Sequence, residues 1–122
     1  MSVPILKQGP YLIATVQAAL TDAELAELQE QLSERVGRFR STGVVIDVGA
    51  VDVLDSFATR MLRDIARVLH LRGAETVIVG INPEVAFAMV RMGLGLEDVA
   101  TALDLEEALE LLRRRDGGRR ER

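Results

Sequence analysis

Cysteine and tryptophan are absent from this 122-residue chain, and aromatic residues make up only 3% of it. The lack of cysteine excludes a disulfide scaffold, a cysteine-based metal site and a thiol nucleophile. With so few aromatic residues, the core must be built from the aliphatic residues and methionine within the 48% hydrophobic fraction. The length suits one domain and is too short for two.

The chain also lacks the segments that direct proteins into or across membranes. Residues 1–5 have neither the basic start nor the apolar run of a secretory signal. No apolar run approaches the roughly 20 residues that cross a bilayer. We therefore expect a cytoplasmic protein with no membrane partner.

Charge is unevenly distributed along the chain, whose formal net charge is -4. Residues 113–122 hold six arginines against two acids, a net of +4, so residues 1–112 carry a net of -8. An acidic body argues against nucleic acid as a partner. Because terminal arginine runs are usually solvated, we expect one domain over residues 1–112 and a disordered tail over residues 113–122.

Short apolar runs alternate with amphipathic segments. The runs predict strands at residues 4–7, 11–16, 44–48, 76–81 and, more briefly, 99–102. Residues typical of helix starts precede the amphipathic segments: Thr21 with Glu24, Asp55, Asn82 with Pro83, and Asp104 with Glu107. This order predicts an α/β fold with a mostly parallel β-sheet, an antiparallel edge strand and a cover of amphipathic helices.

The stretch from Val44 to Arg60 combines a buried strand, an acidic turn and Ser56 in the first turn of the second helix. A hydroxyl there lies on a rigid element, where added negative charge is tolerated. Ser56 is therefore a candidate phosphorylation site. The alternative is that Ser56, or Asp55 before it, only caps the helix. The helix is expected to bury a stripe of Phe57, Met61, Ile65 and Leu69, widened by Leu62 and Val68.

Residues for catalysis or metal binding are scarce. The single histidine, His70, lies about 20 Å along the same helix from Ser56, too far for a catalytic pair. One histidine and no cysteine leave a metal without ligands, and Gly93 and Gly95 do not form a phosphate loop. We expect a protein that is not an enzyme and uses no cofactor or metal.

The residues around Ser56 resemble the signature of STAS domains, the family of the anti-sigma-factor antagonists. The matching residues are Asp47, Asp52, Asp55, Ser56 and Phe57. Further stretches at residues 4–7, 43–47, 80–83 and 101–106 resemble the RsbS-type scaffold proteins of the bacterial stressosome within that family. The resemblance covers about residues 4–112.

This resemblance implies a scaffold that co-assembles with an RsbR-type STAS paralogue into a large hetero-oligomer and sequesters a serine kinase of the RsbT type. Phosphorylation of the motif serine, which falls on Ser56, would release the kinase, and a protein phosphatase would reset the system. RsbR-type relatives carry an acceptor threonine on the third helix, but residues 84–92 here contain neither serine nor threonine. The chain therefore resembles the scaffold more than its paralogue.

Several neighbours of Ser56 have expected roles. We expect Asp52 and Asp55 to present the phosphosite. Flexible methionines suit an adaptable contact surface, so we expect a partner to touch Phe57, Met92, Leu94 and Leu96. Met89 is expected to pack in the core.

Two other functions stay open at this point. The chain could be a free anti-sigma-factor antagonist that binds an anti-sigma kinase one to one through the same serine, or a ligand-binding STAS module. The size of the complex in solution separates the scaffold from the free antagonist.

Overall fold

The helices and strands follow one another in the order expected from the sequence. The computed structural model describes residues 3–93, 95–96 and 99–120. Its elements are β1 (Ile5–Gln8), β2 (Tyr11–Thr15), α1 (Asp22–Phe39), β3 (Gly43–Asp47), α2 (Ser56–Leu71), β4 (Glu75–Val79), α3 (Pro83–Arg91), β5 (Ala100–Ala102) and α4 (Leu105–Arg120). None of the described helices is both long enough and apolar enough to span a membrane.

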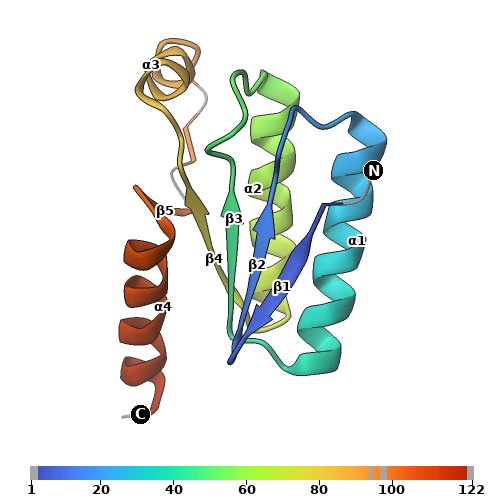
Figure 1. Ribbon diagram of the computed structural model, residues 1–122, viewed down its shortest axis with the longest axis vertical. Coiled ribbons are helices and arrows are strands. Elements are labelled where there is room, and N and C mark those ends of the chain that lie inside the picture. Colours follow the sequence, from blue (N-terminus) through green and yellow to red (C-terminus); the bar gives the residue numbers. More distant parts are fainter. Residues whose placement is uncertain (1–2, 94, 97–98, 121–122) are drawn as a thin grey trace.

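The described strands form one sheet in the order β1-β2-β3-β4-β5 (Figure 1). β1 and β2 pair antiparallel, with Gln8 opposite Tyr11 beside the turn. β2, β3, β4 and β5 run parallel to one another, and Val44 in β3 lies between Leu12 and Thr76. The predicted α/β fold, a mostly parallel sheet with an antiparallel edge strand, is confirmed.

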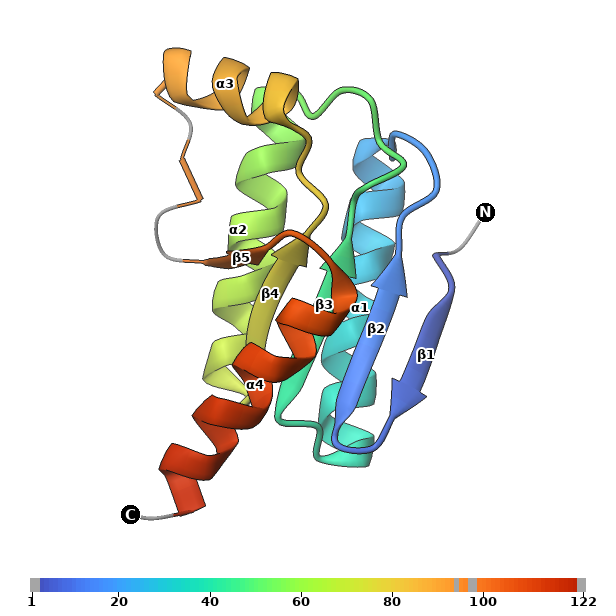
Figure 2. The same ribbon diagram turned by 60° about the vertical axis from the view of Figure 1, so that its left-hand side comes forward.

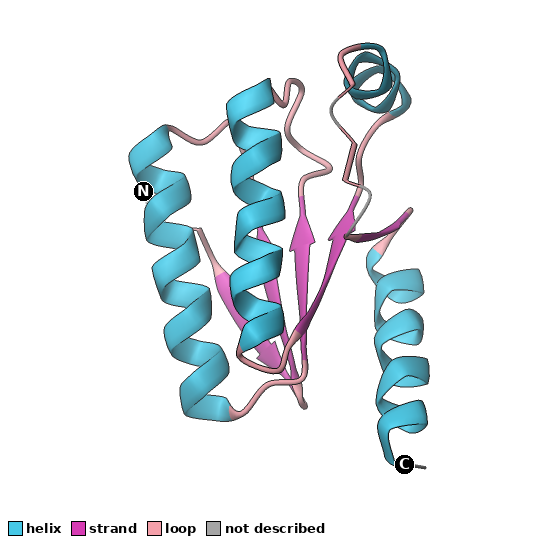
Figure 3. Ribbon diagram, turned by 180° about the vertical axis from the view of Figure 1, so that it is seen from behind, coloured by secondary structure: helices cyan, strands magenta, loops and turns pink. Residues whose placement is uncertain are grey.

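Helices cover both faces of this sheet. α1 and α2 lie side by side on one face and α4 lies on the other, as Figure 2 and Figure 3 show from two sides. Because alternate residues of a strand point to opposite faces, Leu12 and Ile78 pack with α1 and α2, whereas Ile13 and Val77 pack with α4. The central strands are thus apolar on both faces, which explains their continuous hydrophobic runs.

The helix starts are those that the sequence predicts. Thr21 and Glu24 form a capping box on α1, in which the Glu24 N–H donates to Thr21 Oγ1 at 3.2 Å and the Thr21 N–H donates to Glu24 Oε1 at 2.9 Å. The bond from the Thr21 N–H lowers the pKa of the Glu24 carboxyl, because it favours the ionised form. Asn82 and Asp104 likewise accept backbone N–H groups at the starts of α3 and α4.

The buried stripe of α2 differs from the predicted one. The buried residues are Thr59, Leu62, Ile65, Ala66 and Leu69. Phe57, which we expected in the stripe, is 41% exposed. It lies five positions before Leu62, and at about 100° per residue that separation turns it roughly 140° away from the buried side. The prediction for Phe57 as a core residue was therefore wrong.

Helix α4 continues to Arg120, where a disordered tail was expected from residue 113. Tertiary contacts hold this extension. Asp116 Oδ2 accepts hydrogen bonds from Tyr11 Oη at 2.8 Å and from Thr42 Oγ1 at 2.9 Å. Arg115 Nη1 lies 3.5 Å from Glu75 Oε2. Part of the arginine-rich segment therefore packs at the amino ends of β2, β3 and β4.

Gly80 closes a tight contact where β3 and β4 end. It follows β4 with φ +84°, and a Cβ built on it would lie 2.8 Å from the Cα of Gly49. Gly49 follows β3 and donates its N–H to Asp47 Oδ1 at 2.8 Å. A side chain at position 80 would therefore collide with the backbone of Gly49, so only glycine lets the chain approach the loop before α2 this closely.

We predict that Asp116→Ala lowers the free energy of unfolding by about 1–2 kcal/mol, because two partly buried hydroxyls lose a charged acceptor. Urea denaturation measures this difference. Arg114→Ala is the matched control, since it removes only an exposed ion pair with Glu110 and should change the free energy of unfolding by less than about 0.5 kcal/mol. Equal effects of the two changes would contradict a docked helix end.

We predict that Gly80→Ala destabilises the protein by about 1–3 kcal/mol more than Gly73→Ala does. Gly73 has a similar φ of +91°, yet a Cβ added at Gly73 would meet nothing within 4 Å. Both variants carry the cost of a left-handed residue, about 1–2 kcal/mol, so their difference isolates the clash with Gly49. If chemical denaturation gave the two variants equal stability, the backbone at Gly49 would move aside at no cost and the prediction would be wrong.

Candidate functional site

Ser56 is the first residue of α2, which begins beyond the carboxyl end of β3 (Figure 1). Its side chain is half-buried. The residue before it does the capping: Asp55 Oδ1 accepts the Ala58 N–H at 2.7 Å, and the Asp55 carbonyl accepts the Thr59 N–H at 3.0 Å. The prediction that Asp55 caps the helix is confirmed, and the Ser56 hydroxyl is not the N-cap acceptor.

The Ser56 hydroxyl has one polar neighbour that sequence analysis missed. Arg60 Nη2 donates to Ser56 Oγ at 3.2 Å, and both residues are on the outer part of α2. The signal was present in the sequence, because residues four apart on a helix are neighbours on its surface. The site therefore places a guanidinium next to the candidate acceptor oxygen.

The loop between β3 and α2 is held at its start and free at its tip. The Val48 N–H donates to the Val79 carbonyl and the Val51 N–H donates to the Val48 carbonyl, each at 2.9 Å. Val51 is buried, whereas Asp52 is exposed and Val53 is 68% exposed. Asp52 makes no hydrogen bond or ion pair with any described residue. The acidic turn thus presents its tip to solvent immediately before Ser56.

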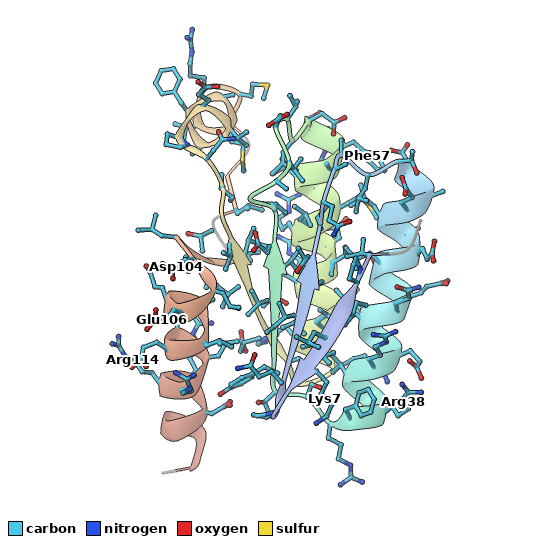
Figure 4. All side chains as sticks on the ribbon, viewed as in Figure 1. Lys7, Arg38, Phe57, Asp104, Glu106 and Arg114 are labelled. Atoms are coloured by element: carbon cyan, nitrogen blue, oxygen red, sulfur yellow. The ribbon has the colours of Figure 1, made fainter. Side chains whose placement is uncertain are left out.

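The expected partner-contact residues have different environments. Phe57 lies near the N-terminal end of α2, where Figure 4 labels it, and Met92 is 56% exposed just after α3. Leu96 is only 9% exposed and packs in the core, so it offers little surface to a partner. Leu94 lies outside the described residues. Met89 is 5% exposed, which confirms its prediction as a core residue.

A second exposed apolar region contains Met92, which the sequence analysis named, and three residues that it did not name. Its members are large and more than half exposed, and they come from α3 and the segments that follow α3 and β5: Phe87 at 65%, Val90 at 76%, Met92 at 56% and Leu103 at 82%. Val90 and Leu103 also line a groove of about 460 Å³ between α3, β5 and α4. Periodicity could not identify this region, because α3 has only nine residues and few of them are buried.

The single histidine of the chain lies far from Ser56. His70 Nδ1 lies 2.9 Å from Glu75 Oε1 near the opposite end of α2. Within the residues that the structure describes, no group of three or more histidine, cysteine, aspartate or glutamate side chains could hold a metal ion. The arrangement offers an acceptor hydroxyl beside a guanidinium rather than a nucleophile beside a base.

Comparison with known proteins places this arrangement in a family. The pattern that defines the STAS domain matches residues 2–108. Two solved structures are similar over nearly their whole length. An RsbS of Moorella thermoacetica carrying a serine-to-glutamate substitution is 37% identical, with 92% of this chain and 95% of that chain covered and a TM-score of 0.78. A chain in a solved structure of the stressosome is 38% identical, with 91% of this chain and 96% of that chain covered and a TM-score of 0.78.

Among curated proteins, the RsbT co-antagonist protein RsbRA of Bacillus subtilis (strain 168) is 27% identical over 111 residues, which is 90% of this chain. The chain spans only 40% of the length of that relative. The structural neighbours also include anti-sigma factor antagonists, which are at most 20% identical and show the shared fold alone. On the match over residues 2–108, the chain belongs to the STAS domain family.

Proposed function

We propose that this protein is a phosphoregulated, non-enzymatic scaffold of a bacterial stressosome. It sequesters a serine kinase of the RsbT type and releases it when Ser56 is phosphorylated. The observation that carries the proposal is the division of roles at the start of α2: Asp55 caps the helix, so the partly exposed Ser56 hydroxyl can be modified without loss of the cap. The 37–38% identity to an RsbS and to a stressosome chain supports it.

The chemical step takes place on the kinase. Ser56 Oγ attacks the γ-phosphorus of ATP, a new O–P bond forms, and the bond between this phosphorus and the bridging oxygen of ADP breaks. The hydroxyl proton passes to a base that the kinase supplies. The product is phosphoserine with a charge of about -1.5 to -2 at pH 7.

The consequence of this charge is electrostatic. The phosphate would join Asp52 and Asp55 at the exposed tip of the acidic turn, beside the apolar side chains of Phe57 and Val53. In water these charges are tolerated, but a kinase that covers them must remove their hydration, and desolvated like charges are costly. We therefore place the kinase on a surface that includes Ser56, Phe57 and Met92, with Asp52 and Asp55 presenting the serine.

The remaining partners follow from the same relatives. An RsbR-type STAS paralogue would join the scaffold in a large cytoplasmic hetero-oligomer, and a phosphatase would remove the phosphate from Ser56. The relationship to RsbRA at 27% identity over 90% of this chain supports a paralogue of that type. The alternative of a free anti-sigma-factor antagonist has weaker support, since those neighbours share only the fold.

We predict that Ser56→Ala folds, binds the kinase and resists phosphorylation. Two other hydroxyls are poor acceptors because they are buried: Thr59, in the next turn of α2, is 3% exposed and its Oγ1 donates to the Asp55 carbonyl, and Ser41, before β3, is 3% exposed. Ser56→Asp should weaken kinase retention, though less than phosphate does, because one carboxylate carries less charge. Incubation with kinase and ATP followed by mass spectrometry maps the acceptor.

Ser33→Ala is the matched control, since Ser33 lies on α1 and accepts from Arg72. It should be phosphorylated like the wild type. Equal phosphate incorporation in Ser56→Ala and the wild type would refute the switch. A small one-to-one kinase complex that does not grow when the RsbR-type paralogue is added would support the free antagonist instead.

The two acidic neighbours can be separated by substitution. Asp55→Ala should lower the free energy of unfolding by about 1 kcal/mol, because the cap is lost, whereas Asp55→Asn keeps an acceptor and should cost a few tenths. Asp52→Ala should be nearly neutral for stability, since Asp52 bonds to no described residue. If the cap presents Ser56, Asp55→Ala is phosphorylated more slowly than Asp55→Asn; equal rates for the two variants would contradict that role.

A further inference from the structure

Arg60 is the one polar side chain that reaches Ser56 in the described part of the chain. Its Nη2 lies 3.2 Å from Ser56 Oγ, and it forms no ion pair with any described carboxylate. Arg60 is exposed, and its guanidinium makes no other polar contact with the residues that the structure describes. A cation with no acidic partner among those residues therefore lies beside the hydroxyl that we propose as phosphoacceptor.

Two other helix arginines have an acidic residue four positions before them. Arg38 lies 3.7 Å from Glu34, and Arg114 lies 3.3 Å from Glu110, so each pairs with a carboxylate four residues earlier. Four residues before Arg60 the chain has Ser56 instead of an acid. Asp64, four residues after Arg60, forms no ion pair with a described residue, in keeping with the weaker pairing of a cation placed before an acid on a helix. Arg60 thus occupies an ion-pair geometry whose acidic position is filled by serine.

We propose that Arg60 is the positioning residue for phosphoserine: its guanidinium holds the phosphate of phospho-Ser56 in an ion pair within α2. The inference rests on the proposed function for the identity of the modified residue. Phosphorylation would convert the neutral hydroxyl contact into charge-assisted hydrogen bonds, and the planar guanidinium can donate two of them to phosphate oxygens. Asp55 caps the helix through its Oδ1, which accepts the Ala58 N–H, and it forms no ion pair with Arg60 in the structure.

This pairing has two chemical consequences. The guanidinium favours the dianion, so it lowers the second pKa of the phosphate. It also shields the phosphate oxygens and orders the ester on the helix surface, which slows hydrolysis by a phosphatase. Arg60 therefore sets how long the modified state lasts, whereas Ser56 sets whether it forms.

The test installs phosphoserine at position 56 directly, by genetic code expansion, so that it does not depend on any kinase. Phosphorus NMR titration then gives the pKa of the phosphate in the wild type, in Arg60→Gln and in Arg60→Lys. We expect this pKa to be higher by about 0.3–0.7 in Arg60→Gln, the range of an exposed ion pair, and intermediate in Arg60→Lys. Removal of the phosphate by alkaline phosphatase should be about two- to five-fold faster in Arg60→Gln.

Arg38→Gln is the matched control, because it removes the same charge at the end of the molecule opposite to Phe57 (Figure 4). It should leave the phosphate pKa and the hydrolysis rate unchanged. The proposal is overturned if Arg60→Gln titrates like the wild type, or if Arg38→Gln shifts the pKa equally. A failure of the kinase to modify Ser56 would refute the proposed function but would leave this result standing.

Discussion

The parallel pairing of β2, β3 and β4 is the constraint on which the rest of this structure depends. Parallel neighbours require a crossover of the chain from one end of the sheet to the other, and here α1 and α2 supply it. Each helix that follows a strand must then begin at the carboxyl edge. This is why the start of α2, the loop before it and α3 gather at one end (Figure 1). The position of Ser56 is a consequence of strand direction.

Different contacts lie at the two ends of the sheet. At the amino ends of β2 and β3, Asp116 ties α4 to Tyr11 and Thr42. At the carboxyl ends, Gly80 packs against Gly49, and the acidic turn leads into Ser56. The central strands between these ends are buried and apolar on both faces, and such interiors are closely packed. Under the proposed function, a charge added at Ser56 would act on a partner bound at that end, while the contacts that stabilise α4 lie at the other.

Local patterns predicted the elements, because caps and hydrophobic periodicity are properties of neighbouring residues. The Thr21–Glu24 capping box, the Asp55 cap and Pro83 after Asn82 were all read correctly. What could not be predicted depends on distant partners. The extension of α4 rests on bonds between residues 105 and 74 positions apart. The exposure of Phe57 depends on which side of α2 faces the sheet. The sequence of α2 offers more than one set of apolar residues for that side, so it does not determine the rotation of the helix about its axis.

The division between Asp55 and Ser56 also bears on how such a site can evolve. When one residue both caps a helix and accepts a phosphate, any change in it alters stability and signalling together. Here the cap belongs to the neighbour, so position 56 can vary among serine, threonine or acidic residues with little effect on folding. If Ser56 is phosphorylated as proposed, selection at that position would be free to follow the preference of the kinase, and a new kinase specificity could arise without a compensating change in the core.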